Sequence, residues 1–319
     1  MAYKQLSEEQ RHMIYALRQE GCSQRRIAEV LRVHPATISR ELRRNIRCRG
    51  YRPAMAHQLA LARKAIPRKP SKLTPIICSR LAHYLKKQWS PEQIAGRLRR
   101  LGSLFISHQT IYKLVALDRM RGGSLFKQLR RGGRRPRRHP TSDGSIIRDR
   151  TSIDLRPAVV AERSRLGDWE ADTIIPPDRK SVLVSLVERM SRFTLLAKIP
   201  NKRASQLTQS VIRLMTPLKS KVLTITSDNG TEFACHKIIS RKLEADFFFA
   251  HAYKAWERGL NENTNGLVRQ YLPKHSSFES ITSQQVSAIM VALNHRPRKS
   301  LDFRTPVEVF YQQSVALGP

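Results

Sequence analysis

Hydrophobic positions in residues 4–47 recur at helical spacing and predict three short helices. Their apolar stripes are Met13, Ile14 and Leu17, then Ile27, Ala28 and Leu31, then Ile38 and Leu42. Boundary signals agree with this division. Ser7 and Gln10 match a capping box, Gly21 ends the first helix, Ser23 can cap the second, and Pro35 suits the first turn of the third.

Three helices in this order predict a helix-turn-helix over residues 1–48, whose last helix could enter a DNA major groove. The residues of that helix expected to face DNA are Thr37, Ser39, Arg40, Arg43 and Arg44. The alternative is a plain three-helix bundle with a solvated charged face.

The same pattern returns in residues 73–118 and predicts a second helix-turn-helix. Ser90 and Ser107 can cap its two clearest helices, which bury Ile94, Ala95, Leu98 and Leu101, and Ile111 and Val115. The DNA-facing residues expected here are His108, Gln109, Thr110 and Lys113. Residues 49–72 and 119–150 are rich in Arg, Lys and Pro, and predict two basic linkers. In the second linker, Arg134, Arg135, Arg137 and Arg138 could follow a phosphate backbone.

The pattern changes in residues 151–319, where strand-like runs appear. Three strands, a helix, a strand, a helix, a strand and a helix follow one another. This order predicts an α/β domain with a ribonuclease-H-like mixed sheet, flanking helices and a C-terminal helical tail. An α/β domain preceded by all-α helix-turn-helix domains is therefore the expected fold class.

Composition narrows the possible partners. The net charge is +34 over 319 residues, and residues 1–150 carry +26 of it. This excess of positive charge produces an electrostatic field that attracts the phosphates of nucleic acid. The N-terminal half is therefore expected to bind double-stranded DNA. The four cysteines form no Cys-x-x-Cys pair, and no apolar run is long enough to span a membrane. A signal peptide is not expected. A protein of the reducing cytoplasm, associated with the nucleoid, is expected.

Three carboxylates of the α/β domain lie on or next to predicted strands and helices. Asp172 lies within the first strand, Asp228 follows the fourth, and Glu262 opens a later helix. In a ribonuclease-H-like sheet the first and fourth strands are neighbours, so the two aspartates could share a metal. Clustered carboxylates on a DNA-binding chain suit two Mg²⁺ ions, with Mn²⁺ as a substitute, acting on a phosphodiester. Each carboxylate alone could equally be a turn or cap residue.

Six segments together resemble the DDE transposases of the insertion-sequence thirty family: residues 39–45, 90–94, 167–173, 226–233, 256–266 and 294–299. The resemblance covers nearly the whole chain, and the Asn-Glu-Asn-Thr-Asn-Gly string at 261–266 is its most specific part. It implies that Asp172, Asp228 and Glu262 are the catalytic triad. It also implies binding of the element's terminal inverted repeats, metal-dependent strand cleavage and transfer of a 3′-hydroxyl to another phosphodiester. A homo-oligomer, at least a dimer on DNA, is expected because two DNA ends must be joined.

Further DNA contacts are expected around Glu262. Trp256 could stack on a base, and several polar residues could hold phosphates: Arg258, Asn263, Asn265, Arg269 and Lys274. Glu170 lies two residues before Asp172, so strand alternation places both on the same face of the sheet. Glu170 could therefore have an accessory role in catalysis. Arg32 and Ala171 stand where the family usually has glycine. Two alternatives remain open: a catalytically silent, sequence-specific DNA-binding regulator, and another ribonuclease-H-like nuclease such as a junction resolvase.

Overall fold

The computed structural model describes residues 5–48, 50–65, 72–130, 147, 149–251, 254, 257 and 259–312. Within the chain there are two compact units, residues 1–72 and residues 73–319. In the described part, no helix is both long and apolar enough to cross a membrane. All four cysteines fall within the described residues and are free thiols.

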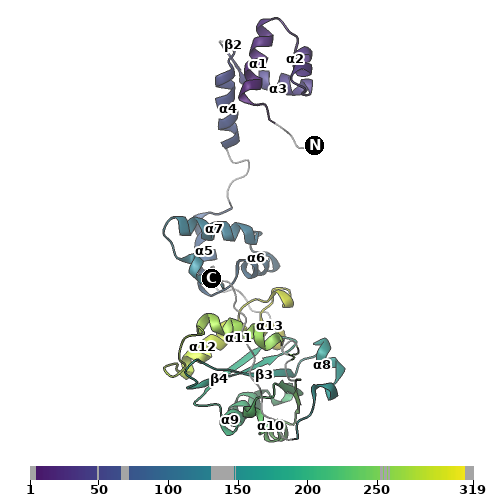
Figure 1. The fold of residues 1–319 in the computed structure, drawn as a ribbon, viewed down its shortest axis with the longest axis vertical. Coiled ribbons are helices and arrows are strands. Elements are labelled where there is room, and N and C mark those ends of the chain that lie inside the picture. Colours follow the sequence, from purple (N-terminus) through teal and green to yellow (C-terminus); the bar gives the residue numbers. More distant parts are fainter. Residues whose placement is uncertain are drawn as a thin grey trace. The chain divides into compact units, whose positions relative to one another are not determined.

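The first unit is the predicted helix-turn-helix with one additional helix (Figure 1). Its elements are α1 (Glu8–Gln19), α2 (Gln24–Val30), α3 (Pro35–Asn45), β1 (Ile46–Arg47), β2 (Gly50–Tyr51) and α4 (Pro53–Ala65). The capping box of Ser7 with Gln10 and the cap at Ser23 are confirmed. So is the burial of Ile14, Ile27 and Ile38, but Met13 is 45% exposed because it lies outside the apolar stripe of α1.

Helix α4 differs from the linker expected over residues 49–72. Its sequence is rich in Ala and Leu, which favour helix strongly. Ala56 is fully buried in the core of the first unit, and Arg63 donates to the side chain of Asn45 over 2.7 Å. Tertiary packing therefore makes about half of this basic segment part of the first unit.

The second unit begins with a further helical bundle. It comprises α5 (Pro75–Lys86), α6 (Pro91–Arg100), α7 (His108–Met120) and a 3-10 turn, η1 (Leu125–Gln128). The predicted caps at Ser90 and Ser107 are present, and Ile94, Leu98 and Ile111 are fully buried. The prediction for Leu101 was wrong. This residue is the C-cap of α6, past the buried face, and it is 42% exposed.

A five-stranded mixed sheet forms the rest of the second unit, with strand order β5-β4-β3-β6-β7. The strands are β3 (Asp168–Ile174), β4 (Val182–Glu188), β5 (Thr194–Ile199), β6 (Thr224–Ser227) and β7 (Asp246–Phe249). β3, β4 and β5 pair antiparallel, whereas β6 and β7 continue parallel to β3. The connectivity and strand order are those of the predicted ribonuclease-H-like sheet, so this fold class is confirmed.

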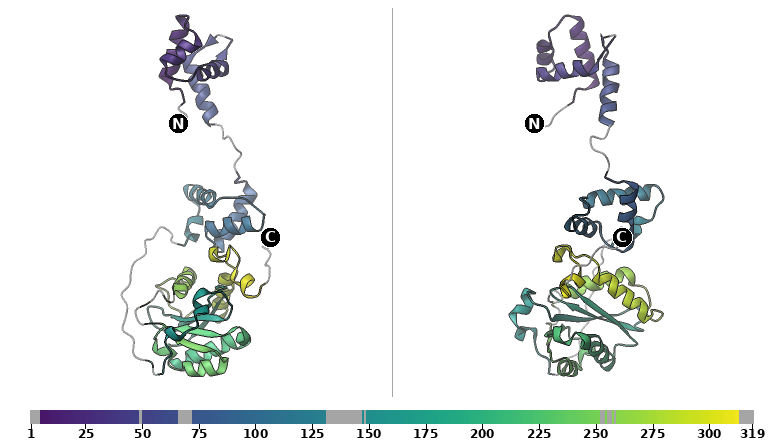
Figure 2. Two further views of the ribbon diagram at one scale, coloured as in Figure 1. Left: turned by 90° about the vertical axis from the view of Figure 1, so that its right-hand side faces the viewer. Right: turned by 180° about the vertical axis from the view of Figure 1, so that it is seen from behind.

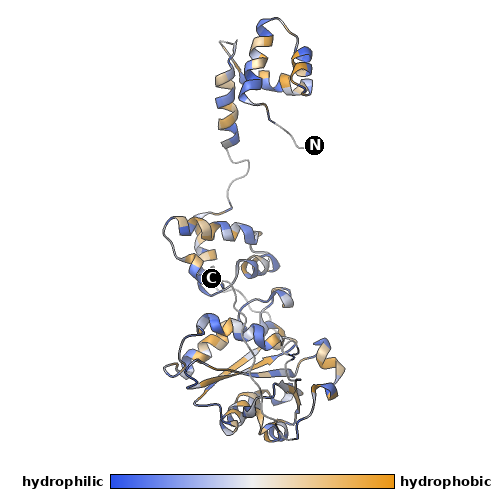
Figure 3. Cartoon of the chain, in the orientation of Figure 1, coloured by the Kyte–Doolittle hydropathy of each residue, from blue (hydrophilic) through white to orange (hydrophobic). Residues whose placement is uncertain are grey.

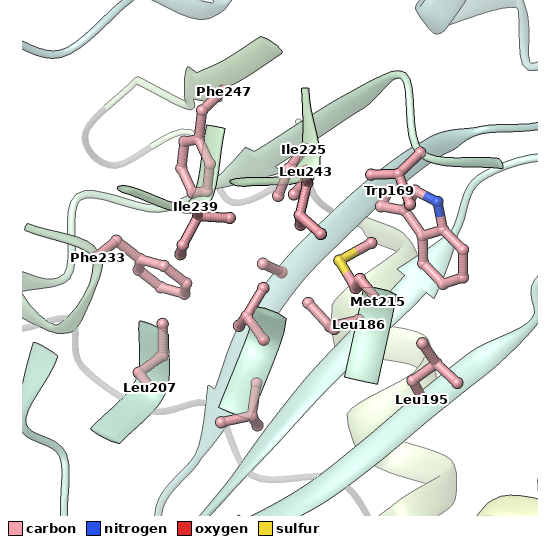
Figure 4. Packing of buried hydrophobic residues seen from close by; sticks show 14 of the residues in the cluster. Trp169, Leu186, Leu195, Leu207, Met215, Ile225, Phe233, Ile239, Leu243 and Phe247 are labelled. Carbon is pink, nitrogen blue, oxygen red and sulfur yellow. The ribbon is translucent and has the colours of Figure 1, made fainter. Parts of the chain in front are cut away.

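Helices cover both faces of the sheet (Figures 1 and 2). The helices and turns are η2 (Ile153–Leu155), α8 (Ala158–Glu162), α9 (Ala204–Met215), η3 (Thr216–Lys221), η4 (Thr231–Phe233), α10 (His236–Leu243), α11 (Gly259–Tyr271), α12 (Ser283–Asn294), η6 (Lys299–Leu301) and α13 (Pro306–Phe310). Buried residues of α9 and α10 pack on one face with Trp169 and Ile225, as Figure 4 shows. Those of α11 and α12 pack on the other face with Ile174 and Leu183.

The alternation of β3 explains this division. Trp169 and Ala171 point into the first core, while Ile174 points into the second. Hydrophobic side chains therefore line the strands on both sides, and the apolar colouring of the sheet in Figure 3 reflects it. The face that carries α11 is the one that Glu170 and Asp172 share, which brings that helix to the candidate site.

Candidate active site

Asp172 and Asp228 come from adjacent parallel strands at the same level. Glu170 of β3 is the register partner of Thr226 of β6. Asp172 and Asp228 each lie two residues beyond this pair, Asp172 still in β3 and Asp228 immediately after β6. The neighbourhood expected for the first and fourth strands is therefore present.

Both aspartates are partly buried and held by local hydrogen bonds. The backbone N–H of Thr173 donates to Oδ1 of Asp172 over 2.9 Å. The N–H of Gly230 donates to Oδ1 of Asp228 over 3.0 Å, closing the Asp-Asn-Gly turn. These bonds orient the carboxylates at the end of the sheet.

Helix α11 is docked onto this strand end by two side chains of β3. The N–H of Asn261 donates to Oε2 of Glu170 over 3.3 Å, and Nδ2 of Asn265 donates to Oδ2 of Asp172 over 2.7 Å. Asn261 and Asn265 are four apart, one helical turn, which matches the two-residue spacing of Glu170 and Asp172 along the strand. The side-chain oxygen Oδ1 of Asn265 also accepts from the hydroxyl of Ser185 over 3.2 Å. Ser185 of β4 is the register partner of Asp172.

Glu262 lies between these two anchor points, in the first turn of α11, and its side chain is exposed. Glu262 thus belongs to the helix that is bonded directly to Asp172. Within the described ranges, no three His, Cys, Asp or Glu side chains stand close enough together to form a metal-binding group.

Glu170 is a buried structural carboxylate. It is fully buried and forms an ion pair with Arg189, besides its bond to α11. Burial lowers the pKa of the Arg189 guanidinium, although the charge of Glu170 opposes this shift. Glu232, by contrast, lies against the opposite face of β3, where it accepts from the hydroxyl of Thr173 over 2.8 Å.

The residues expected to contact DNA in the two helix-turn-helix segments lie mostly at the surface. In α3, Ser39, Arg40, Arg43 and Arg44 are exposed and Thr37 is partly buried. In α7, His108, Gln109 and Lys113 are exposed, while Thr110 is partly buried and bonds with Ser107 across the N-terminus of the helix. Arg134, Arg135, Arg137, Arg138, Trp256 and Arg258 lie outside the described residues.

Two of the residues expected to hold phosphates near Glu262 are engaged within the protein. Asn265 spans Ser185 and Asp172, as described. Arg269 donates to the carbonyl of Ile175 over 2.8 Å, and its guanidinium lies over the ring of Phe278 at 5.2 Å. Asn263 and Lys274 remain exposed on the surface around α11.

Segment 294–299, which carried part of the family resemblance, joins the α/β domain to the second helical bundle. The side chain of Asn294 accepts from and donates to the backbone of Thr194, each over 2.8 Å. Arg296 donates to Gln93 of α6 over 2.9 Å and to Gln270 of α11 over 2.6 Å. Its burial lowers its pKa to about 10.

Further contacts extend the same junction. Lys299 pairs with Glu92 over 2.6 Å, and the ring of Phe303 lies so close to Gly96 that a Cβ there would approach it to 2.3 Å. Sequence reasoning did not predict this junction. The sequence feature that pointed to the junction was the group of cationic residues in segment 294–299, outside the helices expected to bind DNA.

Comparison with known proteins adds the following similarities. Residues 2–45 match the family model of a helix-turn-helix domain. The chain is 40% identical over 313 residues to the transposase for insertion sequence element IS4351 of Bacteroides fragilis, covering 97% of this chain and 96% of the relative. It is 34% identical over 308 residues to transposase InsI for insertion sequence element IS30A of Escherichia coli, covering 92% and 79%. Among solved structures, the catalytic core domain of BIV integrase is similar with a TM-score of 0.37 and 21% identity, covering 46% of this chain and 95% of that one.

Proposed function

The chain belongs to the IS30 family of insertion-sequence transposases, and we propose that Asp172, Asp228 and Glu262 are the carboxylates with which it cuts and joins DNA strands. The observation that carries this proposal is the register of β3 and β6. Asp172 lies in β3 and Asp228 directly follows the adjacent strand β6, and α11 is hydrogen-bonded to Asp172. This arrangement could hold a phosphodiester in a fixed orientation.

The three carboxylates fit a hard divalent cation by their chemistry, although among the described residues they do not stand close enough together to form a metal-binding group. All three side chains are carboxylates, and oxygen ligands are those that Mg²⁺ and Mn²⁺ prefer. Asp172, Asp228 and Glu262 would hold two such ions. The ions would activate the attacking oxygen and stabilise the leaving oxygen of an in-line displacement.

The reaction has two steps. Water attacks a phosphorus at the element end and the bond to the 3′ oxygen breaks, which leaves a 3′-hydroxyl and a 5′-phosphate. That 3′-hydroxyl then attacks a phosphorus of target DNA, displaces its 3′ oxygen and forms a new phosphodiester. Both steps exchange one phosphorus–oxygen bond for another and need no covalent protein–DNA intermediate.

The helix-turn-helix of the first unit would recognise the element's terminal inverted repeats. The exposed arginines of α3 would lie against bases and phosphates in a major groove. Two ends must be held together while they are joined, so we also propose a homo-oligomer of at least two chains on DNA.

A cleavage assay tests the catalytic proposal. Labelled duplex carrying the DNA that flanks the gene would be incubated with Mg²⁺, Mn²⁺ or EDTA. Wild type would be compared with Asp172→Asn, Asp228→Asn and Glu262→Gln. Asp246→Asn is a matched control, because Asp246 is an exposed carboxylate at the start of the neighbouring strand β7.

We expect metal-dependent nicking at one position with wild type and the control, and a loss of at least 10³-fold in each triad variant while DNA binding persists. Tight binding without cleavage by wild type in either metal would favour the DNA-binding regulator instead. Cleavage that follows branched junctions rather than the element end would favour a resolvase.

A further inference from the structure

A second feature of the catalytic unit lies beside the first turn of α11. It is a cavity of about 300 Å³ whose lining includes Arg163, Arg192, Gly259, Asn263, Arg298 and Ser300. Gly259 is the first residue of α11, and Asn263 follows Glu262 directly. The cavity therefore lies at the first turn of α11, which also carries the proposed catalytic residue Glu262. Its lining residues lie far apart in the sequence.

Positive charge in this cavity is not balanced by its lining. The three arginines come from the end of α8, the β4–β5 turn and the segment after α12, and among the described residues no Asp or Glu lines the cavity with them. The buried acids whose charges act on Arg192 have other partners: Glu170 is paired with Arg189, and Glu188 accepts from the backbone of Gly167 and Ser191. Burial lowers the pKa of the Arg192 guanidinium, and the neighbouring Arg163 lowers it further.

Arg298 supplies an independent indication that a ligand is missing. It is 8% exposed, yet among the described residues no group accepts a hydrogen bond from its Nε, and the same holds for the buried Nε of Arg192. Its burial lowers its pKa to about 9, and the charges of Arg296, Arg130 and Arg192 add to the shift. A buried guanidinium without its full set of acceptors is costly unless an anion approaches it.

The start of α11 favours the same kind of ligand. Gly259 and Leu260 line the cavity at the N-terminus of a 13-residue helix, where peptide dipoles leave partial positive charge. Arginine forks and helix N-termini are the groups that bind phosphate oxygens.

We propose that this cavity, lined by Arg163, Arg192 and Arg298, binds a backbone phosphate of the DNA strand that is cut at Glu262. The bound phosphate would be a neighbour of the scissile one, and its capture would fix the strand's register against the carboxylates. The inference rests on the proposed function, because it assigns the ligand to the DNA substrate. It adds residues 163 and 192 to those that the sequence pattern singled out, and it assigns a ligand to Arg298 of segment 294–299.

The test measures DNA binding separately from catalysis. Arg163→Gln and Arg192→Gln would each be placed in the full-length Asp228→Asn chain, which cannot cleave under the proposal. Binding to a duplex carrying the gene's flanks would be measured across a series of salt concentrations. Phosphate-ethylation interference would then locate the contacted phosphates. Arg213→Gln is the matched control, because Arg213 is an exposed arginine on α9, on the other face of the sheet.

We expect Arg192→Gln to lower the slope of log binding constant against log salt by about 1. Interference should also disappear at a single phosphate next to the cleavage position. The Arg163 side chain is exposed, so Arg163→Gln should keep the fold intact and act at the same phosphate. Arg213→Gln should change neither readout. Unchanged slopes and interference patterns in both cavity variants, with melting temperatures within about 2 °C of the parent, would overturn the proposal.

The two proposals fail differently. A wild-type chain that never cleaves, but whose cavity variants still lose one phosphate contact, would refute the catalytic proposal and keep the cavity. A wild-type chain that cleaves at the element end, with cavity variants that bind like the parent, would refute only the cavity.

Discussion

Arg97 of α6 and Glu308 of α13 form a buried bidentate ion pair, although they lie 211 positions apart in the sequence. Nη1 and Nη2 of Arg97 donate to the two carboxylate oxygens of Glu308 over 2.9 and 2.6 Å. The side chains are 2% and 7% exposed. This pair, together with Arg296 and Lys299, makes the second helical bundle and the α/β domain one compact unit.

Removal of one partner of this pair should destabilise the second unit strongly. We expect Arg97→Ala to lower the free energy of unfolding by about 3–5 kcal/mol, because it leaves a buried carboxylate without its cation. Urea unfolding followed by tryptophan fluorescence measures this. The control is Arg100→Ala, whose partner Asp302 is exposed and whose loss should cost about 0–1 kcal/mol. Equal effects of the two variants would contradict a structural role for the buried pair.

Asn265 should act as a positioning residue for Asp172. Asn265→Ala removes the bond to Asp172 and leaves the hydroxyl of Ser185 without its acceptor. We expect the concentration of Mg²⁺ that gives half-maximal cleavage to rise about 10–100-fold, while the affinity for DNA stays constant.

Ser185→Ala serves as the graded control for Asn265→Ala. It removes only the outer bond to the Asn265 amide, so its effect on the Mg²⁺ requirement should be smaller. A loss of DNA affinity in Asn265→Ala with an unchanged Mg²⁺ requirement would instead return Asn265 to the set of DNA contacts.

The pKa of His251 should lie above the ordinary value for an imidazole. Its ring bonds with Glu257 over 2.9 Å and with Asp154 over 2.9 Å, and these bonds raise the pKa of His251 above 6.5. A raised folded-state pKa means that the protonated ring stabilises the fold fully below the unfolded pKa. That contribution is lost as the pH rises through the folded pKa.

An NMR titration of the imidazole resonances of His251 measures this shift directly. Glu257→Gln should bring the pKa of His251 back toward 6.5, because the first and largest cause of the shift is removed. A pKa at or below 6.5 in the wild-type chain would show that the ring is not paired in solution.

Arg32 occupies a left-handed backbone position, with φ of 52°, in the turn of the first helix-turn-helix. Glycine adopts this conformation without steric cost, whereas other residues are strained there. We expect Arg32→Gly to raise the stability of the first unit by about 1 kcal/mol, measured by thermal unfolding. Arg25→Gly, in the first turn of α2, should lower it by up to about 1 kcal/mol because glycine is unfavourable in a helix.

Local signals explain how much of the structure the sequence could predict. Caps such as Ser7, Ser90 and Ser107 act within one helical turn, so their residues predict where helices begin. The strand alternation and element order of residues 168–271 predict a ribonuclease-H-like sheet, because the side-chain period of a strand is local too. That sheet order in turn predicts that Asp172 and Asp228 come from neighbouring strands.

Tertiary packing alone decided the features that join distant segments. Helix α4 is part of a core only because α1 offers it a partner, and its basic composition had suggested a linker. Segment 294–299 docks α6, and the cavity beside α11 gathers Arg163, Arg192 and Arg298 from three separate loops. The amino-acid sequence thus determined most of the helices and strands, the fold class and the family. Folding determined that α4 joins a core and which cations are buried together, since both depend on contacts between residues far apart along the chain.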